Sequence, residues 1–289
     1  MKYTKMLVLF LVILLSVGSV RAAAAEKAEW YWLSSDAKYS KFFAPARVHV
    51  VTSIDNVPTQ IEAWTKTNYS YAGAKETIDN YGIAAQIPDP ETLSYSLARV
   101  EINPQNRTIE YAQEIFYDAN DKPIWSKDYA KRTVKEINSQ SFDEDFYNNI
   151  VDQVFSQGEV DRKNAADRWL LLWQASSVDG ANTSCFADTT TIRQHGDNTI
   201  IWSWEETRNA AGAVTEIKFN KKTYNLPQET EKVIASSYWN AAKGWSDLSS
   251  ELDGHYYSIV PDTNEDVGAG VLRAYIENNK AWVNRYAIK

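Results

Sequence analysis

Side chains that carry oxygen alternate along Asp262–Asp266, which is the spacing at which hard cations such as Ca²⁺ find their ligands. A calcium loop also requires a glycine at its sixth position and a carboxylate at its twelfth. Val267 and Arg273 occupy those places in this chain. Capping of a helix by Thr263 explains the same residues better, because its hydroxyl accepts from a free backbone N–H. We therefore predict no metal site here.

Adjacent carboxylates occur at Asp143–Asp145 and at Glu205–Glu206. Paired carboxylates hydrolyse glycosidic bonds, but acids that are neighbours in sequence are more typical of solvated caps and turns. His49, His195 and His255 are isolated from each other, whereas a zinc site or a histidine-dependent nucleophile requires clustered partners. The sequence thus assigns no catalytic, cofactor-binding or metal-binding residue, and we predict that the protein is not an enzyme.

Aromatic residues are the unusual part of the composition, with 11 Trp and 17 Tyr. Exposed rows of aromatic side chains form binding platforms for sugars or proteins, whereas buried ones fill a core. Four tryptophans recur at matching positions of the internal repeat described below and are expected in the cores: Trp64, Trp125, Trp204 and Trp245. Three aromatic residues lack such counterparts and are better candidates for a surface patch: Trp202, Trp239 and Tyr257.

The N-terminus has the pattern of a secretory signal peptide. Lys2 and Lys5 flank the start of an apolar run from Met6 to Leu15, and either Val20–Ala22 or Ala22–Ala24 fits a small-residue cleavage site. The run is shorter than the roughly 20 residues of a transmembrane helix, and no second apolar run follows. We predict export across the inner membrane to the periplasm or cell surface, with no membrane span after cleavage.

The charge balance bears on the class of partner. Cleavage after Ala22 removes three of the 30 basic side chains and leaves 27 against 38 acidic ones, a net charge of −11. An acidic protein is a poor partner for nucleic acid. The single cysteine, Cys185, cannot form an internal disulfide. It is either buried and inert or a free thiol open to intermolecular pairing.

Two parts of the chain carry similar strings of residues. Ile61 and Trp64 match Ile201 and Trp204 at an offset of 140. Other matches are Ser34–Ser35 with Ser176–Ser177, Phe43–Ala44 with Phe186–Ala187, Tyr117 with Tyr238, and Trp125–Ser126 with Trp245–Ser246. The offset falls to about 120 in the later matches, as a duplication with one insertion produces. The extra residues lie within Tyr69–Pro90, which we interpret as a long connection.

Each copy has the pattern of several strands followed by one helix. Alternation over Leu93–Ala98 predicts a half-buried strand, and the turn-rich Asp118–Pro123 predicts a hairpin. Apolar residues at helical spacing predict the two terminal helices: Phe146, Ile150 and Val154 in the first, and Val267, Val271, Leu272, Tyr275 and Ile276 in the second. Ser141 and Thr263 are the expected N-caps.

These elements predict an α+β protein of two similar modules. Each module is expected to be an antiparallel β-sheet with a C-terminal helix packed on one face. The predicted division is a signal peptide at 1–22, a first repeat at 30–155, a polar linker at 156–167 and a second repeat at 168–289.

Four features recur in both copies: an early Trp before a Ser pair, a strand that ends in Trp64 or Trp204, a hairpin of aromatic, turn, Lys and Trp, and a capped last helix. This pattern resembles the surface-adhesin protein E family of bacterial envelope proteins, over nearly the whole mature chain. The resemblance implies a sheet with a C-terminal helix, and a surface or periplasmic role that sometimes includes binding host matrix proteins. The family's best-known member has a single domain, whereas this chain has two copies. That member also has a disulfide between helix and sheet, which the single Cys185 cannot form. No residue of this chain matches an adhesive residue of the family.

The leading hypothesis is a secreted bacterial envelope protein of two repeated modules that acts in binding or adhesion without catalysis. Its partner is expected to be a host matrix protein, an envelope protein or a glycan, and the binding residues are unknown. One alternative is an enzyme acting on cell-wall or extracellular glycans in a cleft between the modules, which requires two carboxylates about 5–10 Å apart. The other is a structural periplasmic protein that assembles with itself.

Overall fold

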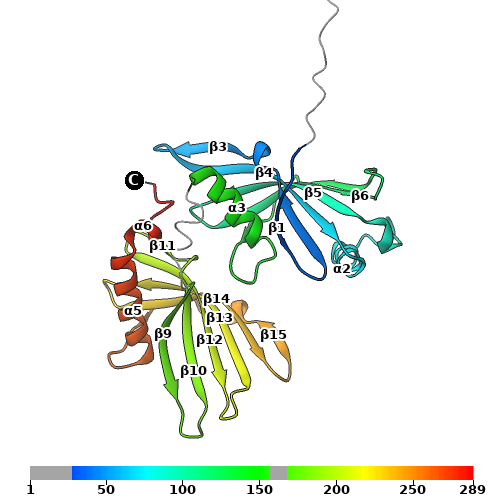
Figure 1. The fold of residues 1–289 in the computed structure, drawn as a ribbon. Coiled ribbons are helices and arrows are strands. Elements are labelled where there is room, and N and C mark those ends of the chain that lie inside the picture. The colour runs from blue at the N-terminus through cyan, green and yellow to red at the C-terminus, as the bar shows by residue number, and fades with distance from the viewer. Residues whose placement is uncertain (1–27, 157–167, 289) are drawn as a thin grey trace, which may run out of the picture.

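The computed structural model describes residues 28–156 and 168–288, which form two antiparallel sheets, one above the other in Figure 1. Each sheet has eight strands, so the prediction of two similar antiparallel modules is confirmed. The predicted signal peptide at 1–22 lies outside the described residues, and so does the predicted linker from 157 onward.

The first module has its strands in the order β1-β2-β4-β5-β6-β7, with β3 paired to β4 and β8 to β6. Its elements are β1 (Tyr31–Ser35), β2 (Tyr39–Phe43), β3 (His49–Ile54), β4 (Val57–Tyr69), α2 (Tyr71–Tyr81), β5 (Tyr95–Asn103), β6 (Thr108–Tyr117), β7 (Pro123–Asp128), β8 (Lys135–Glu136) and α3 (Glu144–Phe155).

The second module repeats this order as β9-β10-β12-β13-β14-β15, with β11 paired to β12 and β16 to β14. Its elements are β9 (Trp169–Ser176), β10 (Asn182–Asp188), β11 (Arg193–His195), β12 (Asn198–Arg208), β13 (Val214–Asn225), β14 (Thr230–Asn240), β15 (Gly244–Asp247), β16 (Tyr257–Ser258), α5 (Asn264–Asn278) and α6 (Lys280–Val283). The two sheets therefore share one connectivity, and α2 is the element that the second lacks between the corresponding strands, β12 and β13.

The segment Tyr69–Pro90, interpreted above as a long connection, contains the helix α2, so that interpretation was wrong. Ser70 caps the helix by accepting a hydrogen bond from the Gly73 N–H, and Gly82 ends it in a left-handed conformation at φ 65°. The buried side of α2 consists largely of small residues, with Ile78 as its one large apolar side chain. Such a weak stripe is hard to recognise by periodicity.

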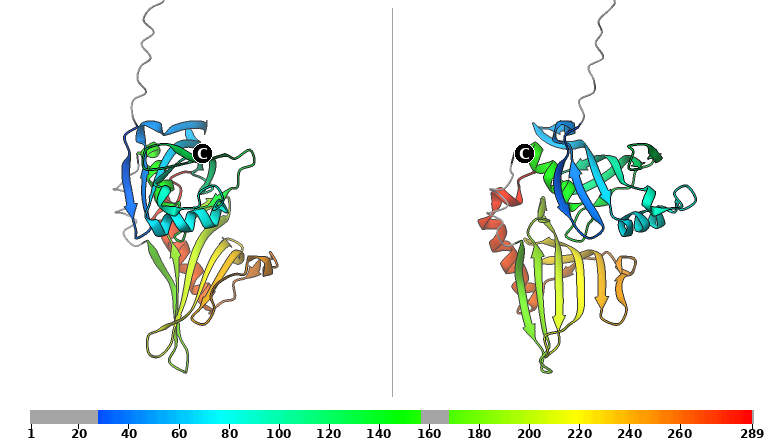
Figure 2. Two further views of the ribbon diagram at one scale, coloured as in Figure 1. Left: turned by 90° about the vertical axis from the view of Figure 1, so that its right-hand side faces the viewer. Right: turned by 45° about the vertical axis from the view of Figure 1, so that its right-hand side comes forward.

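Helices lie on one face of each sheet (Figure 2). Phe146 and Ile150 of α3 share a buried cluster with Ile61 of β4, and Leu272 of α5 shares one with Ile201 of β12. These clusters exclude water from apolar surface, which is the main stabilising term of such folds. We call the side of each sheet that carries Ile61 or Ile201 the inner face and the opposite side the outer face.

The expected helix caps have different outcomes. Thr263 caps α5 by accepting from the Asp266 N–H at 3.3 Å, as predicted. Ser141 does not cap α3, because its hydroxyl accepts from the Asn138 N–H in a tight loop, and Asp143 is the residue before the helix. In the α5 stripe, Val267 is exposed rather than buried.

Strand pairing corrects the repeat alignment in the last hairpin. Trp125 lies opposite Phe116, whereas Trp245 lies opposite Trp239. Counted across the sheets, Trp245 therefore corresponds to Ser126, one residue away from the sequence match. A shift of one residue moves a side chain to the other face of a sheet. Trp125 accordingly packs beside α2 on the inner face, while Trp245 is on the outer face.

Cys185 is buried in the core of the second module, in the same cluster as Leu272. Burial raises the pKa of its thiol to about 12, so the reactive thiolate is scarce at neutral pH. Of the two alternatives left open by the sequence, the buried and inert thiol is the one that this geometry supports.

Two glycines in helices give a matched test of packing. A Cβ at Gly73 would lie 2.3 Å from the Lys38 carbonyl oxygen, which also accepts from the Ser70 N–H, whereas a Cβ at Gly270 meets nothing within 4 Å. We expect Gly73→Ala to lower the free energy of unfolding by about 1–3 kcal/mol through overpacking. Gly270→Ala should raise it by up to about 1 kcal/mol, because alanine favours the helix. Urea denaturation measures both, and equal effects would contradict the close contact.

Candidate functional site

The outer face of the second sheet carries a continuous set of aromatic rings. Trp204 is at its centre, with ring centroids 6.3 Å from Trp169, 5.9 Å from Phe219 and 6.0 Å from Trp245. Trp202 stacks on Phe219 at 4.6 Å. No helix packs on this side in the described residues, since the helical cluster lies on the inner face. We call these five residues the aromatic face.

The first module offers an internal comparison, because its sheet has the same topology. Trp64 and Trp204 correspond, but at the place of Phe219 the first sheet has Arg99, which pairs with Glu62 at 3.1 Å. Glu62 itself corresponds to Trp202 by the same pairing. The fold can therefore be built with an ion pair at these two positions, and the stacked rings of Trp202 and Phe219 distinguish the second module from the first.

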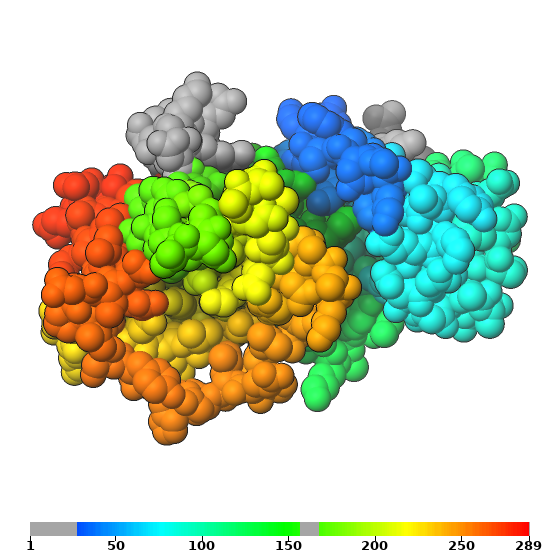
Figure 3. All heavy atoms as spheres, turned by 90° about the horizontal axis from the view of Figure 1, so that it is seen from below, coloured from blue at the N-terminus to red at the C-terminus, as the bar shows by residue number. Residues whose placement is uncertain are grey.

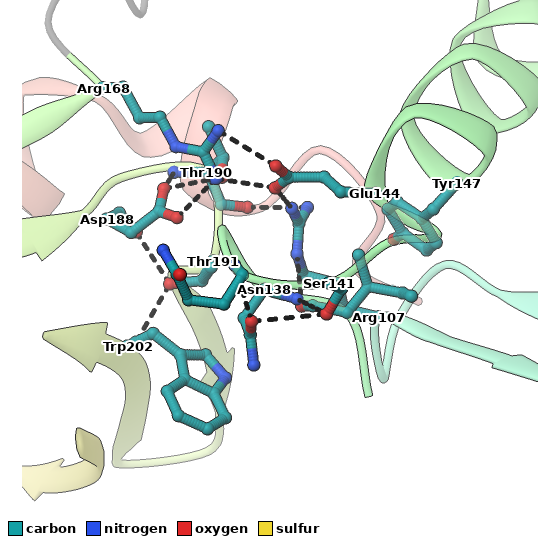
Figure 4. Close-up of polar contacts among 12 residues, drawn as sticks. Arg107, Asn138, Ser141, Glu144, Tyr147, Arg168, Asp188, Thr190, Thr191 and Trp202 are labelled. Carbon is teal, nitrogen blue, oxygen red and sulfur yellow. Dashed lines mark hydrogen bonds and ion pairs between the residues drawn. The ribbon is translucent and has the colours of Figure 1, made fainter. Parts of the chain in front are cut away.

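A polar network joins the modules next to this face (Figure 4). Arg168, just before β9, donates to Glu144 of α3 at 2.6 Å and to Asp188 of β10 at 2.7 Å. Arg107 of the first module also donates to Glu144, at 2.8 Å. Burial opposes the charge of Arg168, but the bonds to Glu144 and Asp188 outweigh it and raise its pKa. The modules are thus held by charge-assisted contacts, which are the stronger class of hydrogen bond.

A second contact binds the first module to the aromatic face directly. Glu136 of β8 accepts from the Trp202 indole Nε1 at 3.0 Å and from the Lys221 ammonium at 2.7 Å. The Thr191 hydroxyl accepts from the Trp202 backbone N–H at 3.0 Å. Trp202 is therefore fixed at both its backbone and its ring, and only 8% of it is exposed.

These contacts place the loop Asn138–Ser141 of the first module over the aromatic face and leave a groove of about 480 Å³ beside it. Trp202, Phe219 and Trp245 line its aromatic side. Figure 3, seen from below, shows the orange β15 region of the second module beside the green part of the first. Six further polar residues complete the lining: Asn138, Gln140, Ser141, Ser237, Ser246 and Asp247.

The structure changes the expectations for individual aromatic residues. Trp245, expected in a core, is 48% exposed, because the register of its hairpin turns it to the outer face. Trp202, a candidate for a surface patch, is buried at the module junction. Tyr257, another such candidate, is exposed. Sequence alone missed the role of Trp202, since the residues that cover it lie more than 60 positions away.

The acids and histidines considered from the sequence are dispersed. Asp145 pairs with Lys41 and Glu205 with Lys218, and Asp266 accepts from the backbone N–H of Asp262 within the helix start. The three histidines are exposed and lie on separate elements. In the described residues, no group of three His, Cys, Asp or Glu side chains is placed to hold a metal ion.

A second cavity, of about 280 Å³, lies on the inner face of the first sheet beside α2. Its lining includes three carboxylates, those of Glu76, Glu114 and Asp143. Glu114 accepts from the hydroxyls of Tyr81 and Tyr129, and Asp143 accepts from that of Tyr111. Burial raises the pKa of Glu114. Glu114 and Asp143 therefore lie within the first module, and both already accept hydrogen bonds from tyrosines. Between the modules, Glu144 and Asp188 lie close together, but both are bonded to Arg168.

Comparisons with known proteins add no family: no protein-family model matches the chain, and no curated protein gives a significant match. The resemblance to the surface-adhesin protein E family stays an expectation. In the part of the chain that the structure describes, none of the helices has the length and apolar character that a membrane crossing requires.

The junction can be tested by removing the charge that both arginines share. Glu144→Gln leaves Arg107 and Arg168 with a neutral partner, and we expect a loss of about 2–3 kcal/mol in the free energy of unfolding. The modules should also separate more readily, which small-angle X-ray scattering detects as a larger radius of gyration. Glu277→Gln is the control, because its pair with Lys280 is exposed and contributes little. Equal stability of the two variants would show that the ion pairs of Glu144 do not hold the modules together.

Proposed function

We propose that the protein is a secreted, non-enzymatic envelope protein that binds a glycan in the groove between its modules. One observation carries the proposal: two sheets of one topology differ in their outer faces, and Trp202 and Phe219 stack beside the groove where the first sheet has Glu62 and Arg99. Folding alone does not require the rings of Trp202 and Phe219, since the first sheet has the ion pair of Glu62 and Arg99 at the corresponding positions.

The chemistry of the groove favours a neutral polyhydroxylated ligand. Tryptophan rings present flat apolar surface with a polar edge, which suits the C–H faces of sugar rings. The surrounding amides and hydroxyls of Asn138, Gln140, Ser237 and Ser246 can both donate and accept hydrogen bonds. The volume lies in the range of small-ligand sites, about 300–1,000 Å³.

Export to the envelope is supported by the sequence pattern of residues 1–22, with its basic start and short apolar run. The resemblance to the surface-adhesin protein E family favours the same location and a role in adhesion. An acidic protein at the cell surface suits neutral or basic partners better than anionic polymers.

The small number of acidic side chains near the groove favours binding over hydrolysis. Of the nine described residues that line it, Asp247 alone carries a carboxylate. Glycoside hydrolases use two flanking carboxylates, one as acid and one as base or nucleophile. Glu136, which contacts the lining residue Trp202, is already bonded to Trp202 and Lys221.

Trp245 provides the decisive variant, because it is half exposed at the edge of the groove. On a glycan array, the mature protein should bind a defined set of glycans. For these, Trp245→Ala should weaken binding by about 2 kcal/mol, near thirty-fold in Kd, as the loss of an aromatic hot spot does. Titration of tryptophan fluorescence measures the change.

Trp32→Ala is the matched control, since Trp32 is 62% exposed but lies in β1 of the first module, away from the groove. It should leave the Kd unchanged. Unaltered binding by the Trp245 variant would place the site elsewhere. Release of reducing sugar from a bound glycan would replace the proposal with the enzymatic alternative, and binding of matrix proteins without any glycan would overturn the ligand class.

A further inference from the structure

Four arginines gather around one backbone segment at the module junction, the loop from Asp188 to Arg193. Its Thr190 carbonyl oxygen accepts hydrogen bonds from Arg107 at 3.2 Å, from Arg193 at 3.2 Å and from Arg285 at 2.9 Å. Arg168 bonds Asp188 at the start of the same loop. A single carbonyl shared by three guanidinium groups carries too little charge to balance them.

The carboxylates of the junction balance half of this charge. Glu144 and Asp188 pair with Arg107 and Arg168. In the described residues, neither Arg193 nor Arg285 has a carboxylate within ion-pair distance. Burying a charge without a partner is costly, so two cations at this place require an explanation.

Arg193 presents an unused edge. It is 7% exposed, and its Nη1 donates to the carbonyls of Ile192 and Thr190. Its Nε and Nη2 are buried without any hydrogen-bond partner. These two groups lie side by side on a guanidinium and point the same way, which is the geometry that grips both oxygens of a carboxylate or phosphate.

Arg285 lies close to Arg193, because both donate to the Thr190 carbonyl, and it too is a buried cation without a carboxylate partner in the described residues. Both guanidinium groups pack on the ring of Tyr286, at 5.1 Å for Arg193 and 4.8 Å for Arg285. The Nε of Arg285 is also buried without a partner. Burial, together with the charge of Arg193, lowers the pKa of Arg285 to about 9. An anion would relieve the strain that each cation imposes on the other.

Arg193 is one of the residues that line a cavity of about 410 Å³ between the modules. The first module contributes Asn103, Gln105 and Asn106 to its lining, and the second contributes His195 and Asn284. Among the described residues that line it there is no carboxylate, and it shares no lining residue with the aromatic groove. An anion could therefore enter without repulsion from the wall.

We propose that this cavity is an oxyanion site, in which Nε and Nη2 of Arg193 bind a carboxylate or phosphate group side-on and Arg285 adds a second positive charge. The bound group would bridge the modules, because the cavity wall comes from both. The proposal is independent of the glycan groove. The shared chemistry could belong to a free small anion or to an acidic group on a larger ligand.

The test uses the mature protein and three probes at equal ionic strength: inorganic phosphate, citrate and chloride. Calorimetric titration should show saturable binding of phosphate or citrate with a rise in Tm, and no saturable binding of chloride. Arg193→Lys keeps the positive charge but loses the paired Nε and Nη2 donors that allow bidentate binding, so it should weaken binding at least tenfold. Arg208→Lys is the control, because Arg208 is an exposed residue on β12, and it should bind as the unaltered protein does.

Arg285→Lys gives a second reading if the Arg193 variant fails to fold, and it too should bind more weakly. A Tm rise with chloride equal to that with phosphate would mean general screening and would overturn the site. Absence of saturable binding of both phosphate and citrate would overturn it as well. Binding of citrate but not phosphate would assign a carboxylate ligand, and the reverse result would assign a phosphate.

Discussion

The charge-assisted bridge from Arg168 to Glu144 and Asp188 is the contact on which the rest of the structure depends. Arg168 stands at the point where the second module begins, and its two acids belong one to each module. Asp188 is fully buried, so its charge is stable only while the arginine stays in place. Without this bridge the loop that covers Trp202 would lose its position, and neither the groove nor the cavity beside Arg193 would keep its shape.

The two sheets share one strand connectivity but differ in their helices and in their outer faces. In the first module, α2 covers the inner face near Phe116 and encloses tyrosines around Glu114, while the outer face carries ion pairs. In the second module that helix is missing, and Trp202 and Phe219 stack on the outer face where the first module has Glu62 and Arg99. A sheet tolerates either pattern because its core depends on the inner residues Ile61 and Ile201 and their neighbours. Differences between the outer faces therefore report on function more than on stability.

The alternation of side chains predicted the strands, and the spacing of short motifs predicted the repeat, because both depend on local periods. The face of Trp245 was not predictable in this way. Its hairpin differs by one residue from the sequence match, and the register emerges only from pairing with Trp239. Helix α2 escaped recognition because its buried side is made of small residues.

The clustering of arginines at the module junction could not be predicted from the sequence, for a different reason. Arg107 and Arg285 are 178 positions apart and meet only at the Thr190 carbonyl. No local pattern reports such a meeting, since it depends on how two separately folded modules dock. A lone buried arginine in a sequence is unremarkable, and its unpaired edge becomes visible only when every donor is matched to an acceptor.

The same short segment supports both candidate sites. Thr191 holds the backbone of Trp202 at the groove, and Thr190 accepts from Arg285 and from Arg193, which lines the cavity. Asp188 anchors the segment to Arg168. A site whose side chains are fixed before binding loses less conformational freedom when the ligand arrives. The rigidity of this segment is therefore not a separate feature of the fold. It is the means by which docking of two similar modules creates binding geometry that neither module has alone.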